Sequence, residues 1–152
     1  MSHVAIIEAE ITSLADLKAA AERIGCELVE GQKTYRWYGR HVGDYPLPTG
    51  FKKEDLGKCE HAIRVKGGND RTYEIGVVAR RDGKPGYTLL WDFYAGGYGL
   101  QKAVGDNANE LVKSYAASAA IRAAKKLGYK VTEKRLATGE IQLTATASAT
   151  KY

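Results

Sequence analysis

The chain has 152 residues, a formal net charge of +5, 44% hydrophobic residues and 27% charged residues. This length fits a single domain, 1–152, that buries a core without help from metal, and two cysteines are too few for a disulfide framework. No apolar run approaches the roughly 18 residues that a membrane span needs, and Met1–Val4 leads directly into a strand pattern. We therefore expect a cytoplasmic protein with no signal peptide and no membrane partner.

The chain opens on a strand–helix–strand pattern. Residues Val4–Ile11 alternate apolar and polar side chains, which predicts a strand with one buried face. Ser13 is typical of a residue that starts a helix, and Gly25 is typical of one that ends it. The short apolar run Cys26–Glu30 then predicts a second strand.

Residues 31–58 are rich in glycine and also contain Pro46 and Pro48, which predicts a long irregular excursion in place of a packed element. Aromatic and basic side chains crowd its first part: Tyr35, Arg36, Trp37, Tyr38, Gly39, Arg40 and His41. So many large side chains are unusual in an idle loop, and we expect Trp37 to be partly packed and Arg40 to be free to meet a partner.

Three consecutive strands are predicted over residues 59–66, 72–80 and 87–94, where apolar side chains again alternate. Short glycine-containing connections between them favour an antiparallel meander. A glycine-rich loop follows over residues 95–105, and it is expected to be a working surface of the protein because loops on a rigid sheet often carry function.

The second predicted helix covers residues 107–127, with Asp106 or Asn107 as its cap and Gly128 after its end. Its expected buried stripe contains Leu111, Tyr115 and Ala119, joined by Ala108, Val112 and Ala123. Residues 129–136 and 140–147 predict a last hairpin, and residues 148–152 are expected to fray. Each half thus has a strand–helix–strand pattern. The predicted fold class is α+β, a largely antiparallel sheet with two helices packed on one face.

The motifs of the chain, in order, are Met1-Ser2-His3, Ile24-Gly25, Tyr73-Glu74-Ile75-Gly76, Trp91-Asp92-Phe93, Gly96-Gly97-Tyr98-Gly99-Leu100, Tyr115-Ala116, Gly128-Tyr129 and Gly139-Glu140-Ile141-Gln142-Leu143. This series resembles the Ycf35-like (DUF1257) family, which occurs in cyanobacteria, plastids, other bacteria and phages. The resemblance covers nearly the whole chain except residues 31–58, and it implies a shared fold and compartment. Because the family has no established biochemical role, it implies no catalytic residues and no cofactor.

Gly96, Gly97, Tyr98 and Gly99 precede a predicted helix, an arrangement in which backbone N–H groups can approach a phosphate. The run matches neither G-x-x-x-x-G-K-[ST] nor G-x-G-x-x-G. A turn that clears the edge of the sheet is the competing interpretation.

Metal and catalytic chemistry lack a complete signature. Cys59 and His61 share a face of their predicted strand, but no second pair stands at ligand spacing. No serine, histidine and carboxylate form a triad pattern, and Glu8 with Glu10 is most simply a solvated strand face. We therefore expect no metal site, no cofactor and buried, unreactive cysteines.

Basic residues outnumber acidic ones between residues 113 and 135, while aromatic rings beside arginine suit a protein-binding hot spot or single-stranded nucleic acid. The sequence favours a small non-enzymatic binding or adaptor protein that acts through protein–protein contacts. The alternative is nucleic-acid or nucleotide binding through the basic second helix and the glycine-rich loop. The candidate binding residues are Tyr35, Arg36, Trp37, Tyr38, Arg40, Gly96, Gly97, Tyr98, Gly99, Lys125 and Lys126.

Overall fold

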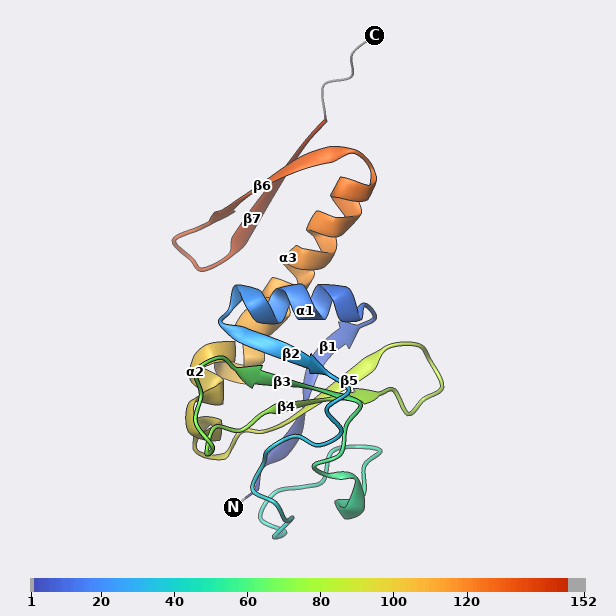
Figure 1. Cartoon of the computed structure of the whole chain (residues 1–152), viewed down its shortest axis with the longest axis vertical. Coiled ribbons are helices and arrows are strands. Elements are labelled where there is room, and N and C mark those ends of the chain that lie inside the picture. The colour runs from blue at the N-terminus through green and yellow to red at the C-terminus, as the bar shows by residue number, and fades with distance from the viewer. Residues whose placement is uncertain (1, 148–152) are drawn as a thin grey trace.

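The computed structural model describes residues 2–147, so the expected fraying of residues 148–152 lies outside the described residues. The strands are β1 (Val4–Ile11), β2 (Cys26–Glu30), β3 (His61–Val65), β4 (Ile75–Ala79), β5 (Tyr87–Asp92), β6 (Tyr129–Arg135) and β7 (Ile141–Ala147). The α-helices are α1 (Leu14–Arg23), α2 (Leu100–Val104) and α3 (Asn109–Lys126). Figure 1 shows helices above a sheet and an irregular segment below it.

The central sheet has five strands in the order β1-β5-β4-β3-β2, and every neighbouring pair is antiparallel. The predicted α+β class is confirmed, as is the β3-β4-β5 meander. The bounds of β1 and β2 are those expected from the sequence. Because β1 and β2 lie at the two edges, each of them pairs with only one other strand of the described chain.

Three helices, not the expected two, cover one face of the sheet and bury a core around Ile7 and Leu89. The first begins as predicted, because the Ser13 hydroxyl accepts a hydrogen bond from the Asp16 N–H at 3.1 Å. The extra helix is α2. Its Leu100 and Val104 are fully buried in the same core, although the neighbouring glycines had indicated a loop.

The start of α3 differs from the prediction. The helix begins at Asn109 after a left-handed Ala108, and no side chain caps it. Asp106, a predicted cap, instead accepts a hydrogen bond from Gln101 at 2.9 Å. The predicted cap is therefore wrong, because α2 and a tight left-handed turn precede the helix and occupy the polar side chain.

The buried stripe of α3 also lies elsewhere than expected. Its buried residues are Leu111, Ser114, Ala117 and Ser118. Leu111 is therefore confirmed, whereas Tyr115 and Ala119 are only half-buried and Ala123 is exposed. The reason is that α3 leaves the sheet after its first turns and packs across α1 (Figure 1).

The last two strands form the predicted hairpin, but this hairpin is a separate two-stranded sheet and does not extend the central one. It lies along the second half of α3 and stands off the rest of the molecule (Figure 1). We call residues 118–147 the arm. Two ion pairs tie the arm to α1, Arg122 with Asp16 at 2.8 Å and Arg23 with Glu133.

The excursion, residues 31–58, covers the other face of the sheet. Its Tyr35, Phe51 and Leu56 are buried in a second apolar cluster against Val78 and Leu90. The excursion is thus largely irregular, as predicted, but packed, because its aromatic and aliphatic side chains shield the sheet face that α1, α2 and α3 leave uncovered. Within the described residues, no helix has the length and apolar character needed to cross a bilayer.

Candidate functional site

A buried carboxylate joins the two segments that the sequence had suggested as working surfaces. Asp92, at the end of β5, has no exposed surface. It accepts backbone N–H hydrogen bonds from His3 at 2.9 Å, from Tyr38 at 3.1 Å and from Tyr94 at 3.1 Å. Each donor belongs to a different segment: the start of β1, the excursion and the glycine-rich turn. Because a buried charge must be compensated, this side chain fixes the three segments to one another.

The glycine-rich turn, Tyr94–Gly99, is left-handed through consecutive residues, with φ of 51° at Ala95 and 53° at Tyr98. A left-handed non-glycine residue costs about 1–2 kcal/mol, so neighbouring contacts must hold the turn in place. The Tyr73 N–H donates to the Gly97 carbonyl at 2.9 Å, and the Thr72 hydroxyl donates to the Tyr98 carbonyl at 3.0 Å. The turn is therefore anchored to the strand segment before β4.

Tyrosines and arginines project from this framework into solvent. Tyr38 is 39% exposed, Tyr45 37% and Tyr98 40%. The Arg40 guanidinium lies 5.8 Å from the Tyr38 ring centre, and that of Arg71 lies 5.5 Å from the Tyr98 ring centre. The Tyr98 ring lies 5.2 Å from the ring of Tyr73, and burial raises the pKa of the Tyr73 hydroxyl to about 12. We call the exposed residues of this region the tyrosine surface: Tyr38, Arg40, Tyr45, Arg71 and Tyr98.

An aromatic cluster connects the tyrosine surface to the start of β1. The His3 ring lies 5.2 Å from the Tyr45 and Tyr94 rings and 5.4 Å from the Phe93 ring. Its Nε2 lies 3.0 Å from an Asp44 carboxylate oxygen. This cluster fixes Tyr45 although its backbone belongs to an irregular segment.

Beside this cluster, a groove of about 760 Å³ opens between β1 and the beginning of α3. Trp91 and Phe93 of the sheet and Val112 of α3 give it apolar walls. Asn109 and Lys113 add polar groups from the helix. Glu8 and Asp106 also line it, so the groove has both apolar and charged walls.

The excursion's other candidate residues have separate roles. Tyr35 is 2% exposed, and its ring packs so closely on Gly76 that a Cβ there would lie 2.3 Å from the ring. Tyr35 is therefore a core residue and not part of the surface, and this burial raises its pKa to about 12. Arg36 is exposed yet donates to the Thr72 carbonyl at 2.8 Å. Trp37 is half-buried in the second cluster, as expected, and Arg40 is exposed.

The backbone of the glycine-rich turn is already hydrogen-bonded to a carboxylate of the protein. Its first N–H, from Tyr94, already donates to the buried Asp92 carboxylate and is not free to bind a phosphate. The helix that follows, Leu100–Val104, is too short to make an anion site of its own. These facts favour the interpretation of the turn as a structural one.

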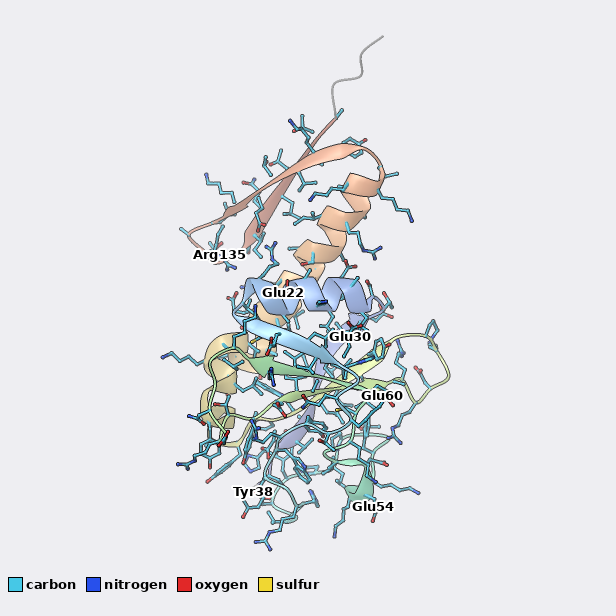
Figure 2. All side chains as sticks on the ribbon, viewed as in Figure 1. Glu22, Glu30, Tyr38, Glu54, Glu60 and Arg135 are labelled. Atoms are coloured by element: carbon cyan, nitrogen blue, oxygen red, sulfur yellow. The ribbon has the colours of Figure 1, made fainter. Side chains whose placement is uncertain are left out.

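Lys125 and Lys126 lie far from the turn. They end α3, whose last turns rise away from the sheet, whereas the turn lies beside α2 at the level of the sheet (Figure 1). In Figure 2, Tyr38 lies at the lower end of the molecule, whereas Arg135, at the end of β6, lies above α1. The basic character of this region is also reduced, because Arg122 pairs with Asp16 and Arg135 lies 3.4 Å from Glu110.

The cysteine and histidine pair is separated by the sheet. Cys59 belongs to the cluster under the excursion, whereas the His61 ring lies 5.7 Å from the Tyr87 ring, which packs on the helix side. The predicted shared face is wrong because β3 begins only at His61. The Gly31 N–H donates to His61 Nδ1 at 2.9 Å. Among residues 2–147, no group of three or more His, Cys, Asp or Glu is arranged to hold a metal ion.

Both cysteines are buried and free, and burial raises the pKa of Cys26 and of Cys59 to about 11. Such thiols are poor nucleophiles at neutral pH.

Sequence reasoning missed four residues of this region: His3, Tyr45, Arg71 and Asp92. Only Asp92 carried a signal, as an acid inside an otherwise apolar strand, next to a glycine-rich run. The others acquire their positions through contacts between distant segments.

No known family model, curated protein or solved structure matches this chain. The resemblance to the Ycf35-like family therefore stays a prediction, and the candidate site rests on its geometry.

Proposed function

We propose that the protein is a small non-enzymatic binding or adaptor protein that contacts another protein through the tyrosine surface. One observation carries the proposal: the excursion and the glycine-rich turn meet around Asp92 and present exposed tyrosines with arginines stacked on them. Tyrosine and arginine dominate protein-binding hot spots because they offer large contact areas with polar ends.

The rigidity of the surface supports the same proposal. Tyr38 is fixed through its own backbone N–H to Asp92, and Tyr98 is fixed through its carbonyl to Thr72. A partner therefore meets side chains on an ordered backbone, which lowers the entropy lost on binding. The free, buried cysteines suit a reducing compartment, and we propose the cytoplasm as the place where this binding occurs.

The experiment compares capture of proteins from the source organism by matched variants. Tyr38→Ser with Tyr98→Ser removes two rings from the surface, and Tyr129→Ser removes a tyrosine of similar exposure, 42%, from the arm. We expect the double variant to lose its captured protein and to keep its melting temperature, while Tyr129→Ser changes neither. Capture of the same protein by wild type and the double variant contradicts the proposal.

The alternative, nucleic acid or a nucleotide, is tested in the same assay. Within residues 2–147, Lys125 and Lys126 lie apart from the glycine-rich turn, so the candidate residues for this alternative do not form one site. The affinity of a protein that makes several phosphate contacts falls by about 10³–10⁵-fold between 50 and 200 mM salt. An interface formed mainly by tyrosine rings should retain its partner over the same range. Nucleic acid in the eluate that disappears with Lys125→Gln and Lys126→Gln would establish the alternative.

A further inference from the structure

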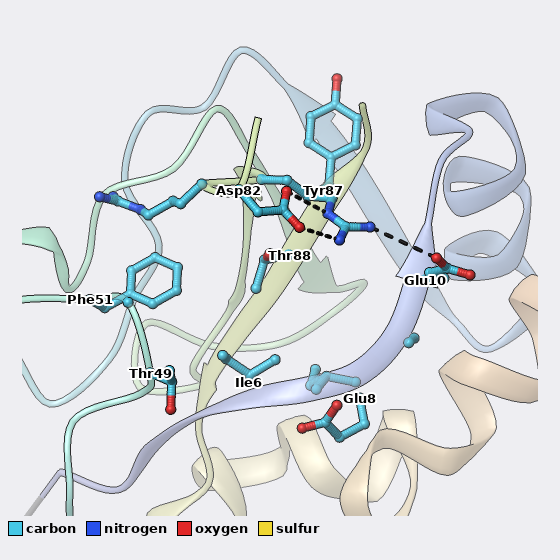
Figure 3. A pocket seen from close by; sticks show the side chains of 13 residues that line it. Ile6, Glu8, Glu10, Thr49, Phe51, Asp82, Tyr87 and Thr88 are labelled. Atoms are coloured by element: carbon cyan, nitrogen blue, oxygen red, sulfur yellow. Dashed lines mark hydrogen bonds and ion pairs between the residues drawn. The ribbon is translucent and has the colours of Figure 1, made fainter. Parts of the chain in front are cut away.

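The arginines of this chain divide into a paired and an unpaired group. All of them lie among residues 2–147, and most form ion pairs with carboxylates of the protein: Arg23, Arg64, Arg80, Arg81, Arg122 and Arg135. Figure 3 shows one such pairing, with dashed lines from Asp82 and Glu10 to the guanidinium of Arg80. Within the described residues, the others form no ion pair: Arg36, Arg40 and Arg71.

The unpaired arginines lie together at the tyrosine surface. Arg40 and Arg71 belong to it, and their guanidinium groups lie 5.8 Å and 5.5 Å from the ring centres of Tyr38 and Tyr98. Arg36 donates to the carbonyl of the residue that follows Arg71. Among residues 2–147, the hydroxyls of Tyr38 and Tyr98 form no hydrogen bond with the protein. Each tyrosine–arginine pair thus offers a positive charge beside a free phenolic hydroxyl.

The acidic groups near this surface do not neutralise it. Asp92 and Glu74 are buried, and each accepts at least one backbone N–H hydrogen bond. An Asp44 carboxylate oxygen lies 3.0 Å from Nε2 of His3. Asp70 is exposed, but it forms no ion pair with any arginine of the described chain. The positive charge of the guanidinium groups is therefore left for an anion from outside.

Guanidinium groups in this arrangement suit carboxylates. Arginine is more weakly hydrated than lysine, and its planar fork donates two parallel hydrogen bonds to a carboxylate, so an unpaired arginine is a better sign of a missing partner than an unpaired lysine. Arg40 and Arg71 lie over different rings, which suits separate single charges. Each of these rings also has a guanidinium over it, whereas a stacked nucleic-acid base needs an open ring face.

We infer that the partner segment that contacts the tyrosine surface is acidic and presents one carboxylate to Arg40 and another to Arg71. This inference rests on the proposed function, because it names the chemistry of the protein partner at the same surface. The carboxylates accept hydrogen bonds from the guanidinium groups, and the tyrosine rings cover the apolar parts of the segment.

The probe is a short fluorescent peptide of glutamate, glycine and leucine, whose binding is followed by fluorescence anisotropy. We expect the wild-type protein to bind it at least about tenfold more tightly than a peptide with glutamine in place of every glutamate. Equal binding of the two peptides, or binding of neither, overturns the inference. A single-stranded oligothymidylate of equal charge is the second probe, and tighter binding of it than of the glutamate peptide would assign the surface to nucleic acid and overturn the inference.

Paired and unpaired arginines provide matched variants. Arg40→Gln with Arg71→Gln should weaken binding of the glutamate peptide by about tenfold and leave the melting temperature unchanged, because both side chains are exposed. Arg81→Gln with Arg135→Gln removes the same charge from side chains that are 46% and 51% exposed and already have carboxylate partners. This control should keep the wild-type affinity. Equal losses in the two variants would reduce the effect to net charge and overturn the inference.

This inference and the proposed function fail in different ways. Capture of the same protein by wild type and by Tyr38→Ser with Tyr98→Ser contradicts the proposed function, whatever the peptides show. Loss of capture in that variant, together with full capture by Arg40→Gln with Arg71→Gln and no preference for the glutamate peptide, leaves the proposed function standing. The same outcome overturns the inference that the partner segment is acidic.

Discussion

The tyrosine surface and the arm are held in place by charged groups in different ways. Behind the tyrosine surface, Asp92 is fully buried and receives three backbone N–H donors, so its charge is compensated away from water. In the arm, Arg122 pairs with Asp16 and Glu133 pairs with Arg23 across the junction with α1. Asp16 is only 4% exposed, but the arm's own side chains, Arg122 and Glu133, are 59% and 42% exposed. A buried carboxylate whose hydrogen bonds are all made by the backbone fixes a structure strongly, whereas water screens an ion pair in which one partner is exposed.

The apolar contacts follow the same division. The central sheet is covered on both faces, with Leu89 and Leu90 each at most 1% exposed. No residue of the β6–β7 hairpin, over the described range Tyr129–Ala147, is classed as buried, and Leu143 is only half-buried. The arm thus contributes little to the core, and we expect it to open before the sheet does.

The largest effect is expected from Asp92→Ala. Removing the carboxylate leaves the N–H groups of His3, Tyr38 and Tyr94 without their acceptor, at a cost of about 3–5 kcal/mol in the free energy of unfolding. Urea unfolding measures the change. The control, Asp70→Ala, alters an exposed acid of the β3–β4 connection and should stay within about 0.5 kcal/mol of wild type. A small change in the free energy of unfolding for Asp92→Ala would mean that the excursion and the glycine-rich turn are held in position without this carboxylate.

A pair of leucine truncations compares the sheet with the arm directly. Leu89→Ala removes a side chain that is 1% exposed and should cost about 2–5 kcal/mol. Leu143→Ala removes one that is half-buried on the hairpin and should cost about 1 kcal/mol. Both values come from urea unfolding under the same conditions. Equal losses would show that the arm belongs to the same cooperative core.

The junction of the arm should respond less than Asp92 or Leu89, and in a pH-dependent way. The Arg122 hydrogen bond lowers the pKa of Asp16 below its ordinary value of 3.8. Its contribution to stability is therefore complete above that value and is lost as the pH falls through the lowered folded-state pKa. Asp16→Asn should cost about 1–2 kcal/mol at pH 7.

Measured by thermal unfolding across pH, the difference between Asp16→Asn and wild type should shrink below the ordinary carboxyl pKa. Glu22→Gln, which alters an exposed α1 carboxylate, is the control and should match wild type at every pH. A constant difference across pH would assign the effect to the loss of packing and not to the ion pair.

Local patterns predicted the parts of the fold whose signals are local. Val4–Ile11 alternates cleanly, and Ser13 and Gly25 delimit the first helix, so these elements have the expected bounds. The short helix α2 was missed because Gly99 and Gly105 on either side of it resembled loop punctuation. The apolar residues Leu100 and Val104 are spaced one helical turn apart, and this spacing was the available sign of a helix between the two glycines.

The candidate site depends on contacts that no local pattern encodes. Tyr38 and Tyr98 were both singled out by their residue types, but their common anchor is a carboxylate far from the excursion in sequence. Tyr35, in the same aromatic run as Tyr38, is buried because Gly76 leaves room for its ring. In a regular strand or helix, the periodicity of apolar residues would have shown that Tyr35 is buried and Tyr38 is exposed. An irregular segment has no such periodicity.

The place of β1 in the sheet also has a consequence for biosynthesis. His3 and Asp92 lie 89 positions apart, so β1 is made long before the β5 strand with which it pairs. At about 5–20 residues per second, the nascent strand waits roughly 4–18 s for its partner. Its apolar side chains are open to other chains on the ribosome during that interval, and such long-range pairing is slow to form. The segment most prone to misassembly during translation is therefore the strand that keeps a free edge in the finished molecule.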